Sequence, residues 1–210
     1  MKKLIIITAG SGSREVLLAI EEINRISPTW EILGFVDENP DLIGKEIDGY
    51  PVIDPKKQKI TNDVYGICGN ANGEIRERLS NEYIEKYKID LATIIAPNVT
   101  IRKNFEVGPG SIIMPDVAIS FDVKLGKGVF VLWKVLIAHH VRLGDYSTIF
   151  SCAKMTGKCT VGDFSTIGAS STINVGVNIG KNCFIGIGSL IYSDIIDNKR
   201  VITHPRQIIK

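Results

Sequence analysis

Charge of one sign and long apolar segments are both missing from this sequence. Its 25 basic and 23 acidic side chains nearly balance over 210 residues, whereas a nucleic-acid-binding surface needs clustered basic residues. The apolar run in MKKLIIITAGSG ends before Gly10, which makes it too short for a signal sequence or a membrane span. We therefore expect neither nucleic-acid binding nor membrane insertion, and a cytoplasmic protein long enough to bury a core.

Cysteine and histidine are scarce as well. The four cysteines have no CxxC spacing, which in a cytoplasmic protein predicts buried, reduced thiols. Only three histidines occur, and two of them, His139 and His140, are adjacent in the stretch LIAHHVRLGD. We interpret the third, His204, as a residue of a C-terminal tail rather than a ligand. Three well-separated imidazole ligands for zinc are therefore hard to assemble, and we expect no metal.

The first 93 residues alternate between strand and helix patterns. A β-branched run over residues 3–8 ends in AGSGSRE, and REVLLAIEEINR then has apolar residues at helical spacing. WEILGFVDENP, NDVYGICGN and DLATIIA have the pattern of further strands, and NGEIRERLSNEYIEKYK that of a second helix. This alternation predicts an α/β unit over residues 1–93, a small Rossmann-like parallel βαβ domain of the nucleotide-binding kind.

Ligands of such sheets bind at the carboxyl ends of the strands. The residues at these ends are Ser11, Gly12, Ser13, Asp37, Glu38, Gly69 and Asn70. Ser11 to Ser13 offer N–H and hydroxyl donors at the start of a helix, an arrangement suited to phosphate. The turn keeps G-x-G but lacks the third glycine of a dinucleotide fingerprint, so it is weak evidence for NAD. The alternative is that Gly12 and Gly69 only form turns.

A different rule governs the chain from residue 95 onward, where an aliphatic side chain occupies every sixth position. The series is Ile95, Ile101, Val107, Ile113, Ile119, Leu125, Val131, Ile137, Leu143, Ile149, Met155, Val161, Ile167, Ile173, Ile179, Ile185 and Ile191. A six-residue period fits neither an α-helix nor a hairpin meander. It predicts an all-β unit, a parallel β-helix of hexapeptide repeats, over residues 94–198, with a tail over 199–210. Three hexads close one triangular coil, so residues three hexads apart stack at a spacing of about 4.8 Å.

Hexapeptide repeats of the form [LIV]-G-x-x-[STAV]-x, preceded by AGSGS, GFVDENP, IGKEIDGYPVI and ICGNANGEIR, resemble one known family. It comprises sialic acid O-acetyltransferases and bacillosamine-type nucleotide-sugar N-acetyltransferases. The resemblance implies a left-handed β-helix, a homotrimer with active sites between subunits, and acetyl-CoA as co-substrate. It also implies that the N-terminal domain binds a nucleotide sugar, with UDP as the expected nucleotide.

The family motif aliphatic-x-His-acid-x-aliphatic-aliphatic-Gly is matched by IAHHVRLG. The resemblance therefore implies that His139 is the general base, which removes a proton from the attacking amine or hydroxyl. His140 occupies the place of the acid, where a carboxylate would orient the imidazole. Because Asp122 stands three hexads before His140, we expect it one coil below. Our hypothesis is that Asp122, or a residue of the adjoining subunit, supplies the missing charge; without the family motif, both histidines would be interpreted as solvated corner residues.

The resemblance also suggests contacts for the cofactor. Gly157 should lie directly above His139, where a glycine leaves room for the donor and exposes an N–H group to an oxyanion. Thr148 stands where some relatives carry a second histidine that contacts the cofactor. Gly168, Ala169 and Gly186 are further expected cofactor contacts.

The predicted function is acetyl-CoA-dependent N-acetyl transfer to a nucleotide-linked amino sugar of the UDP-4-amino-4,6-dideoxy type, for surface glycan or glycoprotein biosynthesis. Transfer should be direct, because Cys159 and Cys183 fall in inward-facing positions and neither matches a nucleophile. One alternative is sugar O-acetylation of the sialic acid type. Another is an impaired relative that binds nucleotide sugars without chemistry, and zinc-dependent carbonic anhydrases share the repeat.

Overall fold

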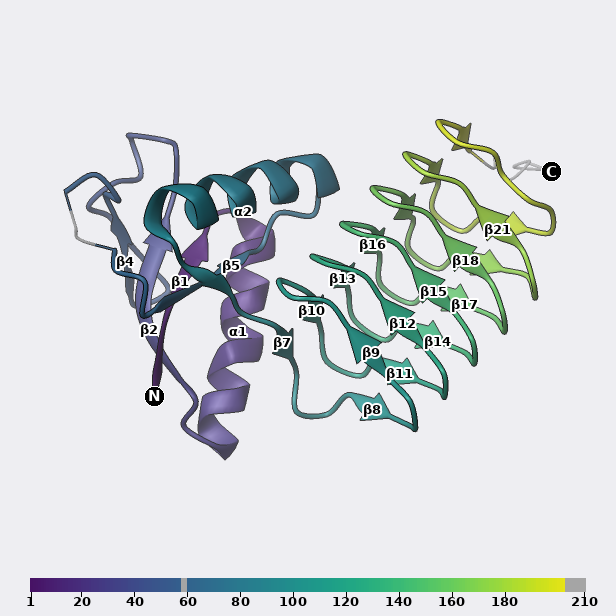
Figure 1. The fold of residues 1–210 in the computed structure, drawn as a ribbon, viewed down its shortest axis with the longest axis horizontal. Helices are drawn as coiled ribbons and strands as arrows, with labels where there is room; N and C mark the ends of the chain where they lie inside the picture. The colour runs from purple at the N-terminus through teal and green to yellow at the C-terminus, as the bar shows by residue number, and fades with distance from the viewer. Residues whose placement is uncertain (58–59, 203–210) are drawn as a thin grey trace, which may run out of the picture.

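The computed structural model describes residues 1–57 and 60–202. A small sheet with two helices forms one end of the molecule, and a coiled stack of short strands forms the rest (Figure 1). This arrangement confirms the predicted succession of an α/β unit and an all-β parallel solenoid. Within the described residues no helix has the length and apolar character needed to cross a membrane.

The described residues of the N-terminal part form six strands and two helices. Its elements are β1 (Lys2–Ile7), α1 (Ser11–Ile26), β2 (Trp30–Val36), β3 (Glu46–Ile47), β4 (Tyr50–Ile53), β5 (Val64–Cys68), α2 (Gly73–Tyr87) and β6 (Asp90–Leu91). The strand order is β3-β4-β2-β1-β5-β6, and all neighbours are parallel except β3 and β4. The carboxyl ends of β1, β2 and β5 therefore lie along one edge of the sheet, as the sequence predicts.

Local sequence explains where the two helices begin and end. α1 buries Val16 and Ile20 on one face and ends at Ile26. The next residue, Ser27, precedes Pro28, a position where the helical backbone is disfavoured, and it is extended. α2 begins after Asn72, whose side chain accepts a hydrogen bond from the N–H of Ile75 at 3.0 Å. It ends at Tyr87 and is followed by a C-cap residue, Lys88, in the left-handed conformation with φ of 57°.

The β-helix is built from two-residue strands. They are β7 (Ile94–Ile95), β8 (Thr100–Ile101), β9 (Glu106–Val107), β10 (Ile112–Ile113), β11 (Ala118–Ile119), β12 (Lys124–Leu125), β13 (Phe130–Val131), β14 (Leu136–Ile137), β15 (Arg142–Leu143), β16 (Thr148–Ile149), β17 (Lys154–Met155), β18 (Thr160–Val161), β19 (Thr166–Ile167), β20 (Thr172–Ile173), β21 (Asn178–Ile179), β22 (Phe184–Ile185), β23 (Leu190–Ile191) and β24 (Arg200–Val201). Ile119 pairs with Ile137 and Leu125 with Leu143, so the predicted coil of three hexads is confirmed.

Three parallel sheets form the sides of the coil. The first sheet contains β7, β10, β13, β16, β19, β22 and β24, the second β8, β11, β14, β17, β20 and β23, and the third β9, β12, β15, β18 and β21. The hexad aliphatics from Ile113 to Ile191 point inward and form one core. β24 pairs with β22 with Val201 opposite Ile185, so the last coil is shorter than three full hexads and the β-helix extends past residue 198. His204 lies outside the described residues.

The cysteines divide into two groups. Cys68, Cys159 and Cys183 are buried, and the last two fill small inward positions of their hexads as expected. Cys152 is exposed, which contradicts the expectation that all four thiols are buried. Its φ of 63° shows the reason, because it stands at a coil corner and not on an inward-facing strand.

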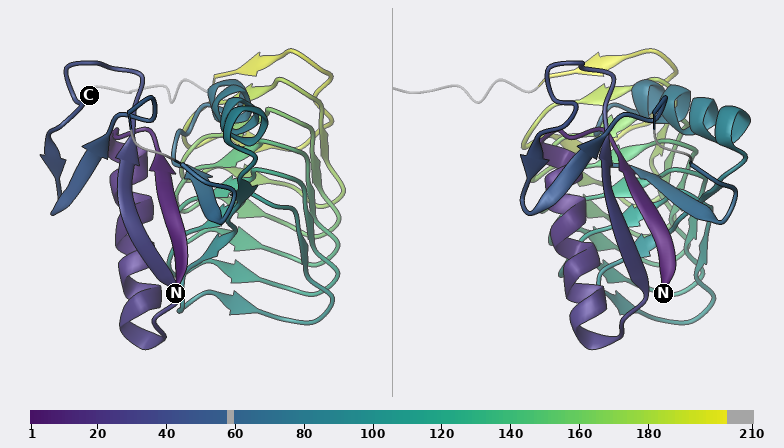
Figure 2. Two further views of the ribbon diagram at one scale, coloured as in Figure 1. Left: turned by 60° about the vertical axis from the view of Figure 1, so that its left-hand side comes forward. Right: turned by 90° about the vertical axis from the view of Figure 1, so that its left-hand side faces the viewer.

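The N-terminal domain lies against the outer face of the first sheet at its first strands (Figure 2), where Ile94, Ile112, Phe130 and Thr148 are buried, while Phe184 of β22 is exposed. Ile112 and Phe130 on that face belong to the same buried apolar cluster as Val16 and Ile20 of α1. The corner that joins the second sheet to the third is therefore the vertex of the triangle opposite the N-terminal domain. We call it the His corner, and it comprises residues 103–104, 121–122, 139–140, 157–158 and 175–176.

Candidate active site

The two adjacent histidines contact each other at the His corner. The Nδ1 atoms of His139 and His140 are 3.0 Å apart, so one of the rings donates a hydrogen bond to the other. The imidazole of His139 stacks on Phe121 of the coil below, with ring centroids 5.4 Å apart and planes 12° apart. Among the residues that the structure describes, none bonds to Nε2 of His139, which leaves this atom available to a ligand.

A carboxylate lies below the second histidine, as predicted from the repeat of the coil. Oδ2 of Asp122 is 3.5 Å from Nε2 of His140, an ion-pair distance rather than a normal hydrogen bond. Oδ1 of Asp122 accepts a hydrogen bond of 2.7 Å from the side-chain amide of Asn104, one further coil down. Asp122, His140 and His139 thus form a continuous line of polar contacts along the corner.

A glycine covers the imidazole of His139 from above, also as predicted. A Cβ atom on Gly157 would lie 2.6 Å from Cε1 and 2.7 Å from Nε2 of His139. The ring is therefore held between Phe121 and the backbone of Gly157. The carbonyl of Gly157 accepts a bond from Gly176, whereas its N–H has no partner within residues 1–57 and 60–202.

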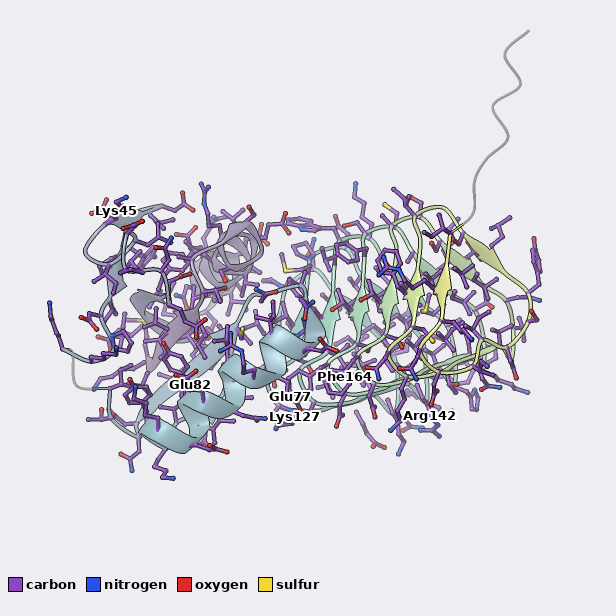
Figure 3. The ribbon with its side chains drawn as sticks, turned by 90° about the horizontal axis from the view of Figure 1, so that it is seen from above. Lys45, Glu77, Glu82, Lys127, Arg142 and Phe164 are labelled. Carbon is purple, nitrogen blue, oxygen red and sulfur yellow. The ribbon has the colours of Figure 1, made fainter. Side chains whose placement is uncertain are left out.

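An open groove of about 640 Å³ runs along the third sheet, and Asp145 and Asp163 line it at the corner between the third and first sheets. The lining glycines recur once per coil, at Gly108, Gly126, Gly144 and Gly162. Arg142, which follows His140 closely in the chain, lies on this face and projects outward (Figure 3). The sequence analysis did not predict this groove. The feature that could have indicated it is the glycine that recurs in every third hexad, because a row of residues without side chains leaves space on the surface.

The expected cofactor residues lie at different places. Gly157 alone of this group contacts His139. Gly168 and Ala169 lie where the chain leaves the first sheet for the second, and Gly186 follows β22 of the first sheet. Thr148 is fully buried at the domain junction, where its hydroxyl donates to the carbonyl of Ala71 at 2.8 Å. The cofactor roles of these four residues stay predictions.

The start of α1 lies at the carboxyl end of β1. Gly10 precedes the helix without a side-chain cap, and the first turn has no acidic residue, so its N–H groups can receive an anion. The hydroxyl of Ser13 is buried 2.6 Å from that of Thr8. Ser11 is exposed, and it is the more accessible of the two serines to a ligand.

Gly12 and Gly69 pack against each other at this edge of the sheet. A Cβ on Gly12 would lie 2.3 Å from the carbonyl oxygen of Gly69, and one on Gly69 would lie 2.4 Å from Cα of Ser13. Both glycines are therefore required by close packing of the two turns. Packing of the two turns explains both glycines without a ligand. Asn70, which follows Gly69, is partly exposed.

Two acidic residues line a cavity at the end of β2. Asp37 accepts a hydrogen bond of 2.8 Å from the N–H of Ala9, which ties the end of β2 to the turn after β1. Glu38 pairs with Arg78, and this hydrogen bond lowers the pKa of the Glu38 carboxyl. The cavity has a volume of about 460 Å³ and is also lined by Tyr83 of α2.

Comparisons with known proteins agree with this architecture. Residues 3–83 match the family model of the PglD N-terminal domain, and no curated protein matches the chain in sequence. The acetyltransferase domain of PglB from Neisseria gonorrhoeae, solved with acetyl coenzyme A, has a TM-score of 0.83 at 22% identity, with 95% of each chain covered. PerB from Caulobacter crescentus, solved with CoA and GDP-perosamine, has a TM-score of 0.83 at 20% identity and covers 93% of this chain and 91% of its own.

WeeI from Acinetobacter baumannii has a TM-score of 0.85 at 23% identity and covers 96% of this chain and 97% of its own. The chain thus has the fold of hexapeptide-repeat acetyltransferases over nearly its whole length. Its first part matches the family model of the PglD N-terminal domain. The resemblance drawn from the sequence motifs is confirmed at this level. In the described residues, no group of three or more His, Cys, Asp and Glu side chains is close enough to hold a metal ion.

Proposed function

We propose that the protein is an acetyl-CoA-dependent N-acetyltransferase that acts on a nucleotide-linked amino sugar. The observation that carries the proposal is the open Nε2 atom of His139, at an exposed corner with a carboxylate two contacts behind it. The solved complexes support the substrate classes, because PglB holds acetyl coenzyme A and PerB holds CoA together with GDP-perosamine. For this chain we propose a UDP-linked 4-amino-4,6-dideoxy sugar.

The proposed reaction is a direct transfer. The sugar amine attacks the thioester carbonyl of acetyl-CoA, and Nε2 of His139 takes the proton that the amine loses as the C–N bond forms. The free N–H of Gly157 is suited to donate to the developing oxyanion. When the tetrahedral intermediate collapses, the C–S bond breaks, and the thiolate of CoA receives the proton from His139.

The line of polar contacts explains how His139 would present a lone pair at Nε2. A carboxylate next to Nε2 of His140 favours a proton at that nitrogen, so that Nδ1 of the neutral His140 ring accepts a hydrogen bond. His139 then donates from its own Nδ1, and its Nε2 remains unprotonated. In the opposite tautomer of His139, Nε2 carries the proton and is no base.

Replacing Asp122 with asparagine tests this arrangement. The side chains of Asp122 and His140 are 37% and 47% exposed, so solvent weakens the interaction between their charges. We therefore expect kcat to fall by only about threefold to tenfold. The pH–rate profile should change as well, because the negative charge that faces His140 is gone. Kinetics with acetyl-CoA and the amino sugar across the neutral pH range measure both effects.

Asp116 provides a matched control for this variant. It has the same left-handed backbone, with φ of 61° against 57° for Asp122, and accepts an equivalent hydrogen bond from Asn98. It faces no histidine, so Asp116→Asn should leave the kinetics unchanged. An Asp122→Asn enzyme with the wild-type rate and pH–rate profile would refute the role of the carboxylate.

The active site is proposed to form between subunits of a homotrimer. His139 lies at the vertex opposite the first sheet, whereas the turns for the nucleotide sugar belong to the domain on that sheet. A substrate held by one chain's N-terminal domain would therefore reach the base of a neighbouring chain. Phe121 and Val175, exposed by 44% and 61% at the His corner, supply apolar surface for such an interface.

A panel of acceptors tests the proposed function. Purified protein is incubated with acetyl-CoA and with UDP-amino sugars, the matching UDP-sugars that carry a hydroxyl, and sialic acid, and release of CoA is recorded. We expect turnover of the amino sugar and a solution mass of three chains by light scattering. Turnover of hydroxyl acceptors alone would indicate the O-acetyltransferase alternative, and nucleotide-sugar binding without turnover would indicate the impaired relative.

A further inference from the structure

Arg76 of α2 is a buried cation without a carboxylate partner. Its side chain is only 1% exposed, yet no acidic residue in the described part of the chain pairs with it. The guanidinium instead donates to backbone carbonyls, from Nε to Gly128 at 2.7 Å, from Nη1 to Asn70 at 2.6 Å and from Nη2 to Tyr146 at 2.8 Å. Burial lowers the pKa of Arg76 to about 10, so the side chain remains charged at neutral pH.

These bonds connect the two domains through one turn. Gly128 and Tyr146 belong to the corner between the third and first sheets, whereas Asn70 belongs to the turn after β5. Figure 3 shows α2, with Glu77 labelled, reaching the part of the β-helix that carries Lys127 and Phe164.

Thr148 reinforces the connection from the β-helix side. Its hydroxyl accepts a bond of 3.1 Å from Nη2 of Arg76 and donates to the carbonyl of Ala71. The carbonyls of two successive turn residues, Asn70 and Ala71, are thus both held by side chains that cross the domain junction.

The turn that contains Asn70 and Ala71 packs directly against the start of α1. Gly69 precedes Asn70, and its carbonyl oxygen would lie 2.3 Å from a Cβ on Gly12. Phe130 contacts both sides of this packing, 3.9 Å from the same Cβ position and with its ring 5.8 Å from the guanidinium of Arg76. A shift of the Asn70 turn would therefore shift the N–H groups at the start of α1.

We propose that Arg76 is a positioning residue for the diphosphate of the nucleotide sugar. Through the Asn70 turn it fixes the N–H groups at the start of α1, and it adds a positive charge behind them. The inference rests on the proposed function, because it needs an anionic nucleotide at this edge of the sheet. It assigns to Arg76 an effect on nucleotide-sugar affinity and none on the transfer step at the His corner.

Arg76→Lys tests the proposal. Lysine keeps the charge but lacks the planar fork that reaches four carbonyls together, those of Gly128, Asn70, Tyr146 and Ser147. We expect the KM for the nucleotide sugar and the Kd for UDP, measured by calorimetry, to rise about tenfold. The kcat and the KM for acetyl-CoA should stay within about twofold, a split that a general loss of folding would not produce.

A second variant keeps the test decisive if Arg76→Lys does not fold. Thr148→Val retains Arg76 and removes the hydroxyl that ties Ala71, and it should raise the same KM with little change in kcat. Ser171→Ala is the control, since Ser171 is equally buried in the β-helix and loses two hydrogen bonds, to Gly186 and Ser189, that involve no residue of the junction. Its thermal stability should fall while the KM stays at the wild-type value.

The wild-type protein separates the two possible failures. If it binds no UDP and acetylates no nucleotide sugar, the proposed function and the role of Arg76 both fail. If it does bind and turn over the sugar, a folded Arg76→Lys or Thr148→Val protein with unchanged KM and Kd overturns the role of Arg76 alone.

Discussion

We expect His139→Ala to lower kcat by about two to four orders of magnitude, the usual contribution of a general base. Within the described residues of the His corner, Nε2 of His139 is the one ring nitrogen open to a ligand, and this variant removes it. Nδ1 of His139 already bonds to His140. The KM values should change little, since binding of both substrates depends on other groups. The loss should shrink at alkaline pH, where hydroxide can take the proton that the amine loses as the C–N bond forms.

Lys134→Ala is the control for this substitution. Lys134 is exposed at the corner between the first and second sheets, with φ of 57°, and it contacts neither histidine. Equal circular dichroism spectra and melting temperatures for both variants exclude misfolding as the cause of the loss. A His139→Ala enzyme within about threefold of wild-type kcat would leave the protein without its proposed base.

The contacts of His139 and His140 could be predicted from the sequence because, in a β-helix, residues a fixed number of positions apart in the chain lie in contact on neighbouring coils. A coil of three hexads stacks Asp122 beneath His140 and Gly157 above His139, and the structure has both contacts. No long-range packing problem had to be solved to find them. The same rule predicted the buried positions of Cys159 and Cys183.

The N-terminal domain was less predictable, because its turns are arranged by tertiary packing. Strand and helix patterns predicted β1, β2, β5 and both helices, but the two-residue strand β3 is too short to show alternation. Ser13 has the sequence context of a ligand donor, whereas the packing of Gly12 on Gly69 turns its hydroxyl inward to Thr8. Which atoms of a turn face a ligand depends on such packing and not on the turn sequence.

The domain junction was missed for a similar reason. Arg76 lies on the same face of α2 as the buried residues Leu79 and Tyr83. A charged residue on an otherwise apolar helical face was thus the feature of the sequence that could have indicated its burial. Its oxygen partners come from distant parts of the chain, as far along as Thr148. Only the assembled fold brings these oxygens together, and the same contact buries Thr148, which was expected to meet the cofactor.

Gly157→Ala should inactivate the enzyme almost as strongly as loss of the base, without removing any polar group. The added Cβ would lie within 2.7 Å of two ring atoms of His139, and the ring cannot retreat downward because Phe121 stacks on its other side. The imidazole must therefore swing out of the corner. A displacement of about 1 Å at a reacting group lowers the rate by about 100-fold, and we expect that loss in kcat.

A comparison with Gly188→Ala separates this clash from general damage. Gly188 has φ of 68° with open space around its Cβ position, so alanine there strains the backbone and costs about 1 kcal/mol of stability but leaves kcat unchanged. Gly157→Ala should show the reverse, a nearly normal melting temperature with little activity. Adding Phe121→Ala to Gly157→Ala opens space beneath the ring and should restore part of the rate. If Gly157→Ala alone retains the wild-type kcat, the imidazole does not act from the position between Phe121 and Gly157.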